Sequence, residues 1–211
     1  MYTAKSEYLD HDVVRDYEIS RFRGALGRYR WRREQRGVGR ILEMIDSSVI
    51  NKILDCPVGN GRWLERLAAL SPNEIVGTDV SPAMLEAARA RAAECNLKVE
   101  LLEGVAESLP FDDGLFDLVF CHALAKHLPK QVQRTALLEL SRVARHYVVC
   151  SFVVRKGIGG VIGRLRRAGG AVVVTEIEIV QWAAEAGLRL LSSESSTTPV
   201  GLERSYLFAR P

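Results

Sequence analysis

The chain has 211 residues, 47% of them hydrophobic, and a formal net charge of +3. These values predict one domain over residues 1–211 with enough apolar side chains to bury a core. No apolar run approaches the roughly 18–20 residues that cross a bilayer, and charged residues near the start break up any signal-peptide segment. We therefore expect a cytoplasmic protein and exclude a transmembrane one.

Strand and helix patterns alternate from residue 52 onward. Strands are expected near residues 52–56, 74–79, 98–102, 116–121 and 147–153, and then at 188–191 and 206–209. Helices are expected at residues 61–70, 82–95 and 130–144, with a short one at 105–109, and a capping box at 175–178 opens another that ends at Gly187. Apolar runs within the strand segments are typical of strands buried on both faces. The pattern predicts an α/β fold around a parallel sheet.

The four cysteines are not arranged as a metal or redox motif. They show no C-x-x-C spacing, and three of them fall at or near the ends of predicted buried strands: Cys56, Cys121 and Cys150. A free thiol in such a place behaves as a small apolar side chain. We expect reduced, structural cysteines and no metal, and keep only Cys121 as a candidate reactive thiol.

One strand runs into a glycine turn, and the next strand ends in an acid. Residues 53–61 read Ile-Leu-Asp-Cys-Pro-Val-Gly-Asn-Gly, and Asp79 follows the second apolar run. A turn that admits a ligand close to the backbone, beside a carboxylate at the next strand tip, predicts a nucleoside-binding crevice. Leu64 stands where the dinucleotide fingerprint has its third glycine, which argues against a nicotinamide oxidoreductase.

The order Asp-x-Pro-x-Gly-x-Gly, followed by Asp79, resembles the class I S-adenosylmethionine (SAM) dependent methyltransferases, most closely their small-molecule type 11 group. Residues 80–89, 104–111, 114–119 and 124–129 are similar to later segments of that family. The resemblance covers residues 50–150 well, residues 151–211 in pattern only and residues 1–48 scarcely. It implies a Rossmann-like, doubly wound sheet of about seven strands, mostly parallel with an antiparallel last strand, after an N-terminal helical extension.

The resemblance also implies a different role for each of three segments of the chain. Residues 1–48 would form a helical cover, residues 50–150 the cofactor-binding core, and residues 151–211 the substrate side and closing strands. The cofactor-binding residues that it implies are Asp55, Pro57, Gly59, Gly61, Asp79, Val80, Met84, Val105, Ala106, Glu107 and Cys121. Asp79 would accept the ribose hydroxyls. Asp55 would hold the glycine turn or accept from the cofactor's ammonium group.

Two positions depart from the family pattern. Pro57 replaces the first turn glycine and donates no hydrogen bond, so ligand contacts would come from amides around Gly59 and Gly61. Val105 stands where many members carry an acid for the adenine amino group. That contact is then made by the backbone, made by Glu107 or absent.

The tip of the fourth predicted strand carries the candidates for catalysis. His122 is the leading general base, and His127 is the second, although each also fits a loop histidine with no chemical role. The segments that follow this strand in amino-directed nucleic-acid methyltransferases and in metal-dependent catechol enzymes are missing here. The motifs predict methyl transfer to an O, N or C atom of a small molecule, without a metal.

Arginines gather in two segments that the family resemblance places over the crevice. Residues 21–40 hold eight arginines and one acid, Glu34, and residues 155–167 hold five basic residues and no acid. These segments are either solvated faces or a binding surface for phosphate or carboxylate groups, and RNA or an anionic membrane would also fit. The main hypothesis is a small-molecule methyltransferase with an acidic or phosphorylated acceptor. The alternatives are an RNA- or macromolecule-directed methyltransferase and a SAM-binding module that has lost catalysis.

Overall fold

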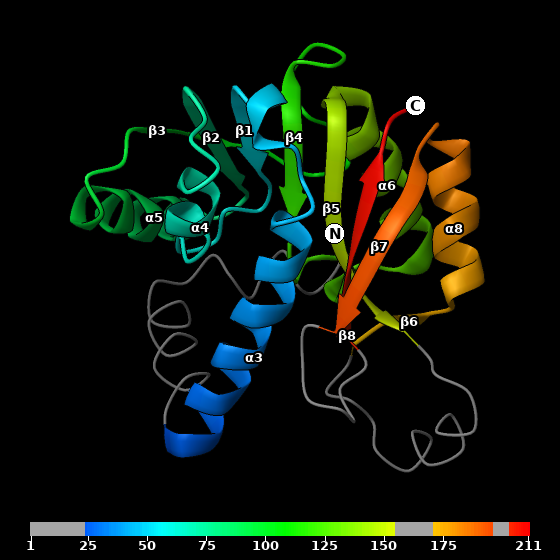
Figure 1. Ribbon diagram of the computed structural model, residues 1–211, viewed down its shortest axis with the longest axis horizontal. Helices are drawn as coiled ribbons and strands as arrows, with labels where there is room; N and C mark the ends of the chain where they lie inside the picture. Colours follow the sequence, from blue (N-terminus) through cyan, green and yellow to red (C-terminus); the bar gives the residue numbers. More distant parts are fainter. Residues whose placement is uncertain (1–23, 155–170, 196–202) are drawn as a thin grey trace.

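The structure, a computed structural model, describes residues 24–154, 171–195 and 203–211. Its strands form one sheet in the order β3-β2-β1-β4-β5-β8-β7, with β6 beside β5 (Figure 1). The strands are β1 Lys52–Asp55, β2 Glu74–Asp79, β3 Val99–Glu103, β4 Phe116–Cys121, β5 Ala144–Val154, β6 Val173–Val174, β7 Arg189–Ser195 and β8 Glu203–Ala209. Only β8 runs antiparallel to its neighbours in this described sheet. The predicted doubly wound sheet with an antiparallel last strand is confirmed, and β6 is an additional short strand.

Helices cover both faces of the sheet. The α-helices are α3 Gly24–Leu42, α4 Leu64–Ala68, α5 Pro82–Glu94, α6 Lys130–Val143 and α8 Glu176–Glu185, and the 3-10 helices are η1 Ser47–Val49 and η2 Ala125–His127. Buried apolar side chains of α3 and α4 and most of those of α5 belong to one apolar cluster, and those of α6 and α8 belong to another. Ala83 and Met84 of α5 form a small cluster of their own. No helix in the described ranges is both long and apolar enough to cross a membrane.

The central strands supply alternate residues to the two clusters. Ile53 of β1 and Leu118 of β4 belong to the cluster under α3, α4 and α5, whereas their neighbours Leu54 and Val119 belong to the cluster under α6 and α8. Successive side chains of a strand point to opposite faces, so a strand covered on both faces is apolar along most of its length. All six residues of β4 are buried and five of them are apolar, the exception being Asp117 near its start.

The strand order changes direction between β1 and β4. From β1 the chain proceeds outward to β2 and β3, and then returns to place β4 on the other side of β1. The connections on the two sides cover opposite faces, which leaves a crevice at the carboxyl ends of β1 and β4. The glycine turn after β1, Asp79 at the end of β2 and His122 after β4 all lie at this edge.

The structure differs most clearly from the prediction in three elements. The short helix expected at residues 105–109 is wrong, since Val105 and Ser108 form an isolated β-bridge across a turn. Pro110 follows directly and disfavours helical backbone at Leu109, whose amide donates instead to Glu139 Oε1 at 2.8 Å. The helix expected at 61–70 is limited to α4, because the turn continues through Trp63. Strand β5 begins and ends outside the predicted 147–153.

The capping box of α8 is present as predicted. Thr175 Oγ1 accepts from the Glu178 amide at 3.2 Å, and Glu178 Oε2 accepts from the Thr175 amide at 2.8 Å. These bonds satisfy two amides that the first turn of a helix leaves open. We expect Thr175→Ala to lower the free energy of unfolding by about 1 kcal/mol in urea denaturation.

Thr135→Ala is the matched control for the cap. The Thr135 hydroxyl donates to the Gln131 carbonyl inside α6, where that acceptor already belongs to a helix turn. Alanine has the higher helix propensity, so this variant should be at least as stable as the native chain. Equal losses for the two variants would show that the cap contributes nothing of its own.

Candidate functional site

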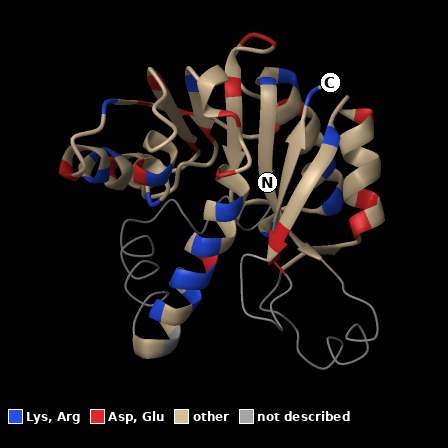
Figure 2. Ribbon diagram, in the orientation of Figure 1, with Lys and Arg blue, Asp and Glu red and all other residues tan. Residues whose placement is uncertain are grey.

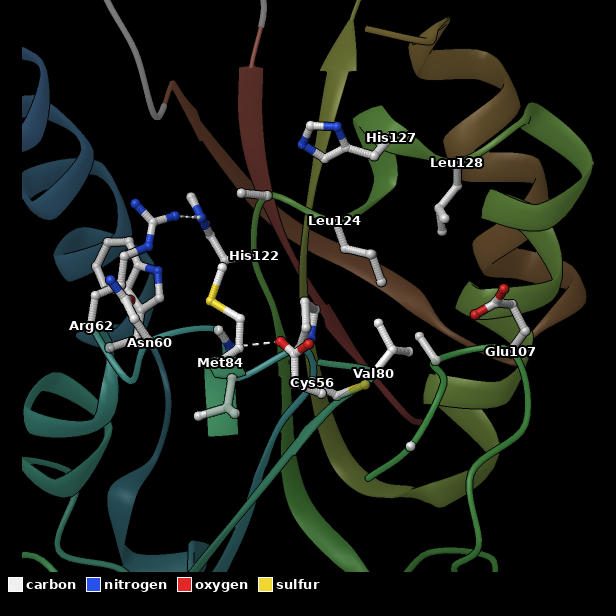
Figure 3. A pocket seen from close by; sticks show the side chains of 18 residues that line it. Cys56, Asn60, Arg62, Val80, Met84, Glu107, His122, Leu124, His127 and Leu128 are labelled. Carbon is white, nitrogen blue, oxygen red and sulfur yellow. Dashed lines mark hydrogen bonds between the residues drawn. The ribbon is translucent and has the colours of Figure 1, made fainter. Parts of the chain in front are cut away.

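A hollow lies at the carboxyl ends of β1, β2 and β4. Its volume is about 990 Å³, which includes the solvent-open space at its mouth. Its lining residues are Cys56, Pro57, Val58, Gly59, Asn60, Arg62, Trp63, Asp79, Val80, Met84, Gly104, Ala106, Glu107, His122, Ala123, Leu124, His127 and Leu128. In Figure 3, Asn60 and Arg62 stand on one side of it, and Glu107 and Leu128 stand on the other. The hollow is therefore at the crevice that the strand order predicts.

The glycine turn is held by its own amides. The Val58 amide donates to the Thr78 carbonyl at 2.8 Å, the Gly59 amide to Asp79 Oδ2 at 3.0 Å, and the Gly61 amide to the Val58 carbonyl at 3.0 Å. The first two bonds fasten the turn to β2, and the third closes the turn itself. Ligand binding by the amides around Gly59 and Gly61 stays a prediction. Gly59 itself lines the hollow, so the fastened turn forms one wall of it.

Gly61 faces away from the hollow and packs the turn against α5. Its φ is +77°, and an added Cβ would lie 2.9 Å from Leu64 Cδ1 and 3.2 Å from the Ala88 Cα. Gly59 also has a positive φ of +54°, but a Cβ there would meet nothing within 4 Å. The two glycines therefore serve different needs: backbone conformation at both, and close packing at Gly61 alone.

We expect Gly61→Ala to cost more stability than Gly59→Ala. Both substitutions place a side chain in the left-handed region, at about 1–2 kcal/mol each, and overpacking adds about 1–3 kcal/mol at Gly61 only. Urea denaturation of the two variants measures the difference. A loss at Gly59 equal to that at Gly61 would contradict the packing role.

Asp79 closes the bottom of the hollow at the end of β2. Its Oδ2 accepts from Gly59 and its Oδ1 accepts from the Ser81 amide at 3.0 Å. Burial raises the pKa of this carboxyl, and the hydrogen bonds from Ser81 and Gly59 oppose that rise. A carboxylate has about four acceptor positions, so Asp79 keeps acceptor capacity toward the hollow.

Asp55 lies beneath the turn rather than in the hollow's lining. It is fully buried, and neither of its carboxyl oxygens has a hydrogen-bond partner among the described residues. Burial raises the pKa of Asp55 well above its usual range, although the nearby Arg62 charge opposes this. Such a buried carboxyl without partners favours a cationic group close to the turn.

The predicted adenine-side residues separate into two groups. Val80, Met84, Ala106 and Glu107 line the hollow, and Ser81 caps α5 as predicted by accepting from the Met84 amide. Val105 is outside the lining. Glu107, the side chain considered as an alternative contact for the adenine amino group, therefore lies at the hollow.

Cys121 is buried under the end of β4 and does not line the hollow. It is paired in register with Cys150 of β5, and both thiols are free. A hydrogen bond with the Cys150 thiol, together with burial, raises the pKa of Cys121 well above its usual range. Because the thiolate is the reactive form, these surroundings favour a structural thiol, and a contact between Cys121 and a cofactor stays a prediction.

Both predicted catalytic histidines reach the hollow. His122 is 5% exposed and contacts Arg62, whose Nη2 lies 3.2 Å from His122 Nδ1. Arg62 Nη1 in turn lies 3.4 Å from Glu34 Oε2, on helix α3. His127, at the end of η2, is half-buried on another part of the lining (Figure 3).

The wall between the two histidines is held from the adjacent strands. Ala123 has a left-handed φ of +66°, and its amide donates to Ser151 Oγ of β5 at 2.7 Å. Ser151 Oγ donates to the buried Glu203 of β8 at 3.3 Å, and Lys126 Nζ also donates to that carboxylate, at 3.1 Å. These bonds fix a strained segment in which a shift would move both His122 and His127.

Several lining residues had not been assigned to the site from the sequence: Cys56, Val58, Asn60, Arg62, Trp63, Gly104, Ala123, Leu124 and Leu128. Most of them adjoin a predicted site residue, so extending each motif by one or two positions would have found them. Glu34 is different, because it stands alone in an arginine-rich segment. Only the packing of α3 against the sheet brings it to Arg62.

Arginines recur along helix α3 (Figure 2). Arg28, Arg32, Arg36 and Arg40 recur at every fourth residue and are exposed, whereas Glu34 faces inward and is 4% exposed. Arg40 pairs with Glu194 of β7 at 2.8 Å. The basic residues at 155–167 lie outside the described residues.

Comparison with known proteins agrees with this geometry. Residues 53–146 match the family model described as a methyltransferase domain. A demethylmenaquinone methyltransferase of Thermus thermophilus is 38% identical over 91 residues, which cover 43% of this chain and 39% of that protein. The chain matches less than half the length of the curated relatives considered.

Solved structures share the fold. Magnesium protoporphyrin IX methyltransferase from Synechocystis PCC 6803, crystallised with S-adenosylhomocysteine (SAH), superposes with a TM-score of 0.65 at 21% identity, covering 96% of this chain and 100% of that chain. The [4+2]-cyclase SpnF has a TM-score of 0.66 at 18% identity, covering 84% of this chain and 83% of that chain. At these identities the likeness establishes the fold alone.

Proposed function

We propose that the protein is a class I SAM-dependent methyltransferase that transfers a methyl group from SAM to a small molecule, because residues 53–146 match the methyltransferase domain model. The observation that carries this proposal is a pair of buried carboxyls, one lining the hollow and one beneath the glycine turn. Asp79 at the end of β2 keeps acceptor capacity, and Asp55 beneath the turn has neither oxygen hydrogen-bonded among the described residues.

The residues present suit this cofactor. Asp79 is placed to accept from the ribose hydroxyls, and the buried Asp55 lowers the cost of bringing a cation to the glycine turn. Val80 and Met84 offer an apolar surface for the adenine, with Glu107 as the acidic group on that side. Bound SAM would supply a methyl group activated by a cationic sulfonium. An acceptor atom attacks the methyl carbon in line, and the sulfur leaves in SAH.

The chain's own contribution to rate is mainly positional. Holding an acceptor atom at the methyl group in a fixed orientation is worth up to about 7–11 kcal/mol. The strained wall at Ala123, fastened to Ser151 and Glu203, provides such a rigid surface beside the hollow. If the acceptor must lose a proton, one of the two lining histidines, His122 or His127, takes it, for about 10²–10⁴-fold in rate.

The acceptor that we propose is an acidic or phosphorylated small molecule, methylated on O, N or C without a metal. The exposed arginines of α3 support an anionic acceptor, because guanidinium groups bind carboxylate and phosphate in a fork. RNA is the second candidate, on the same arginines, and its binding would weaken steeply with added salt.

The test is SAH production from SAM with a panel of paired acceptors, each anion beside its uncharged analogue. We expect turnover for an anionic member and none with Asp79→Ala. Turnover on RNA that falls steeply with salt would favour the second candidate. SAM binding without turnover on any acceptor would favour a SAM-binding module that has lost methyl transfer, or a protein that catalyses a different reaction on the same fold.

A further inference from the structure

Three ionisable side chains from three separate elements meet at one wall of the hollow. They are Glu34 of α3, Arg62 from the turn after β1, and His122 after the end of β4. Arg62 Nη1 is 3.4 Å from Glu34 Oε2, and Arg62 Nη2 is 3.2 Å from His122 Nδ1, a contact drawn in Figure 3. The side chains of Glu34 and His122 are 5% and 1% exposed, so water competes little for these contacts.

Aromatic rings hold the same groups in place. The Arg62 guanidinium carbon lies 5.6 Å from the Trp31 ring centroid and 5.3 Å from that of Trp63. The His122 ring lies 5.0 Å from Trp63 and is stacked on Phe120 at 6.0 Å with an interplanar angle of 9°. The guanidinium contacts two indoles that also contact each other, and the imidazole packs beside two aromatic rings, so both groups have little freedom to turn.

The contact between Arg62 and His122 determines where the imidazole carries its proton. A guanidinium has only donors, so Nδ1 of His122 must accept, and the ring proton is then on Nε2. A second proton at Nδ1 would point at the guanidinium and place two cations side by side. Within the described residues, the charged groups in contact with the ring are Arg62 and Glu34, and Glu34 Oε1 is 3.6 Å from Nδ1, beyond hydrogen-bond distance.

We propose that Arg62 is a positioning residue that keeps His122 neutral, with its proton on Nε2, and that Glu34 holds Arg62 in place. His122 is then a hydrogen-bond donor and not the general base, because its one lone pair is taken by Arg62. For the methyl transfer proposed above, on which this consequence rests, proton removal falls to His127. Helix α3 thereby contributes a residue to the site as well as an outer basic surface.

The direct test is the protonation state of His122 in the full chain. The chain has four histidines, His11, His122, His127 and His146, so nitrogen NMR of protein labelled with ¹⁵N-histidine gives four resolvable rings. The His122→Gln variant assigns the signal. We expect His122 to be neutral, with the proton on Nε2, at every pH between about 6 and 8, where an unrestrained histidine titrates.

Removal of the Arg62 guanidinium should allow His122 to become protonated. In Arg62→Met, the guanidinium that donates to Nδ1 is gone and Glu34 remains beside that atom, so His122 should take up a proton at Nδ1 and titrate within the same pH range. Arg66→Met is the matched control, because Arg66 Nε also reaches α3, donating to Gln35 Oε1 at 3.2 Å. Its His122 signal should equal that of the native chain.

The inference is overturned if native His122 carries its proton on Nδ1, or titrates between about pH 6 and 8. It is overturned as well if Arg62→Met leaves the His122 signal unchanged. The native spectrum alone decides the first point, should the variant not fold. SAH binding by the same sample reports separately on the proposed function, since the protonation state is read without cofactor.

Discussion

Asp79→Ala is expected to abolish SAH binding in a protein that remains folded. The carboxylate is the one group at the end of β2 that can accept from two ribose hydroxyls, and hydrogen bonds to a charged acceptor contribute about 1.5–3 kcal/mol each. Two such bonds correspond to an affinity at least about 100-fold weaker. The substitution also frees the Gly59 amide, which loosens the turn and acts in the same direction. Calorimetric titration measures the loss.

Asp117→Ala is the control for this experiment. Asp117 is also a buried carboxylate that accepts from two backbone amides, those of Asn51 and Lys52, both at 2.9 Å. It lies at the start of β4, at the opposite edge of the sheet from the hollow. This variant should lose stability and keep its SAH affinity. Unchanged affinity in a folded Asp79→Ala protein would remove Asp79 from the cofactor site.

Asp55→Asn is expected to stabilise the fold and weaken cofactor binding. The native carboxyl is fully buried, and its oxygens have no hydrogen-bond partner among the described residues, so it must take up a proton on folding, a cost that a neutral amide avoids. We expect the free energy of unfolding to rise by about 1–3 kcal/mol. SAH affinity should fall at least about 10-fold, because Asp55 can release its proton when the cationic end of the ligand arrives, whereas an amide cannot become a counter-charge.

The increase in the free energy of unfolding of Asp55→Asn should depend on pH, and the raised pKa of Asp55 gives its direction. Above about pH 3.9, the unfolded chain releases the Asp55 proton while the folded chain retains it. The native free energy of unfolding therefore falls as pH rises toward the folded pKa, and the asparagine variant lacks this contribution. Urea denaturation at several pH values should show a difference that widens with pH.

Asp117→Asn provides the comparison for this second variant. Both Asp117 oxygens have partners, two backbone amides at Oδ2 and the Arg145 guanidinium at Oδ1, so its neutralisation should destabilise the chain. A loss of stability in Asp55→Asn, or a gain in stability that is constant across pH, would contradict the description of Asp55 as a buried acid with a raised pKa.

The fold was largely predictable because its strongest signals are local. The apolar runs of β1, β2 and β4, the cap at Ser81 and the capping box at Thr175 are each set by a few adjacent residues, and all of them are confirmed. The segment at 105–109 is a failure of the same kind of reasoning. A few residues of helical composition gain too little from one turn to outweigh the proline that follows.

The site was predictable only where a motif marks it. Asp79 ends β2, His122 follows the end of β4, and His127 ends the short helix η2 that comes next, and all three line the hollow. The role of Glu34 depends instead on tertiary packing. Its neighbours are arginines directed to solvent, and nothing in their spacing shows that this one acid faces the sheet. The protonation of His122 likewise depends on Arg62, which is 60 residues away in the chain.

Titration of the native chain with SAH, with NAD as the control ligand, tests the cofactor assignment most directly. We expect one site with an affinity of about micromolar or tighter, and no heat with NAD. Absence of SAH binding at about millimolar concentration would mean that the hollow does not hold this cofactor, and the proposed methyl transfer would fail with it.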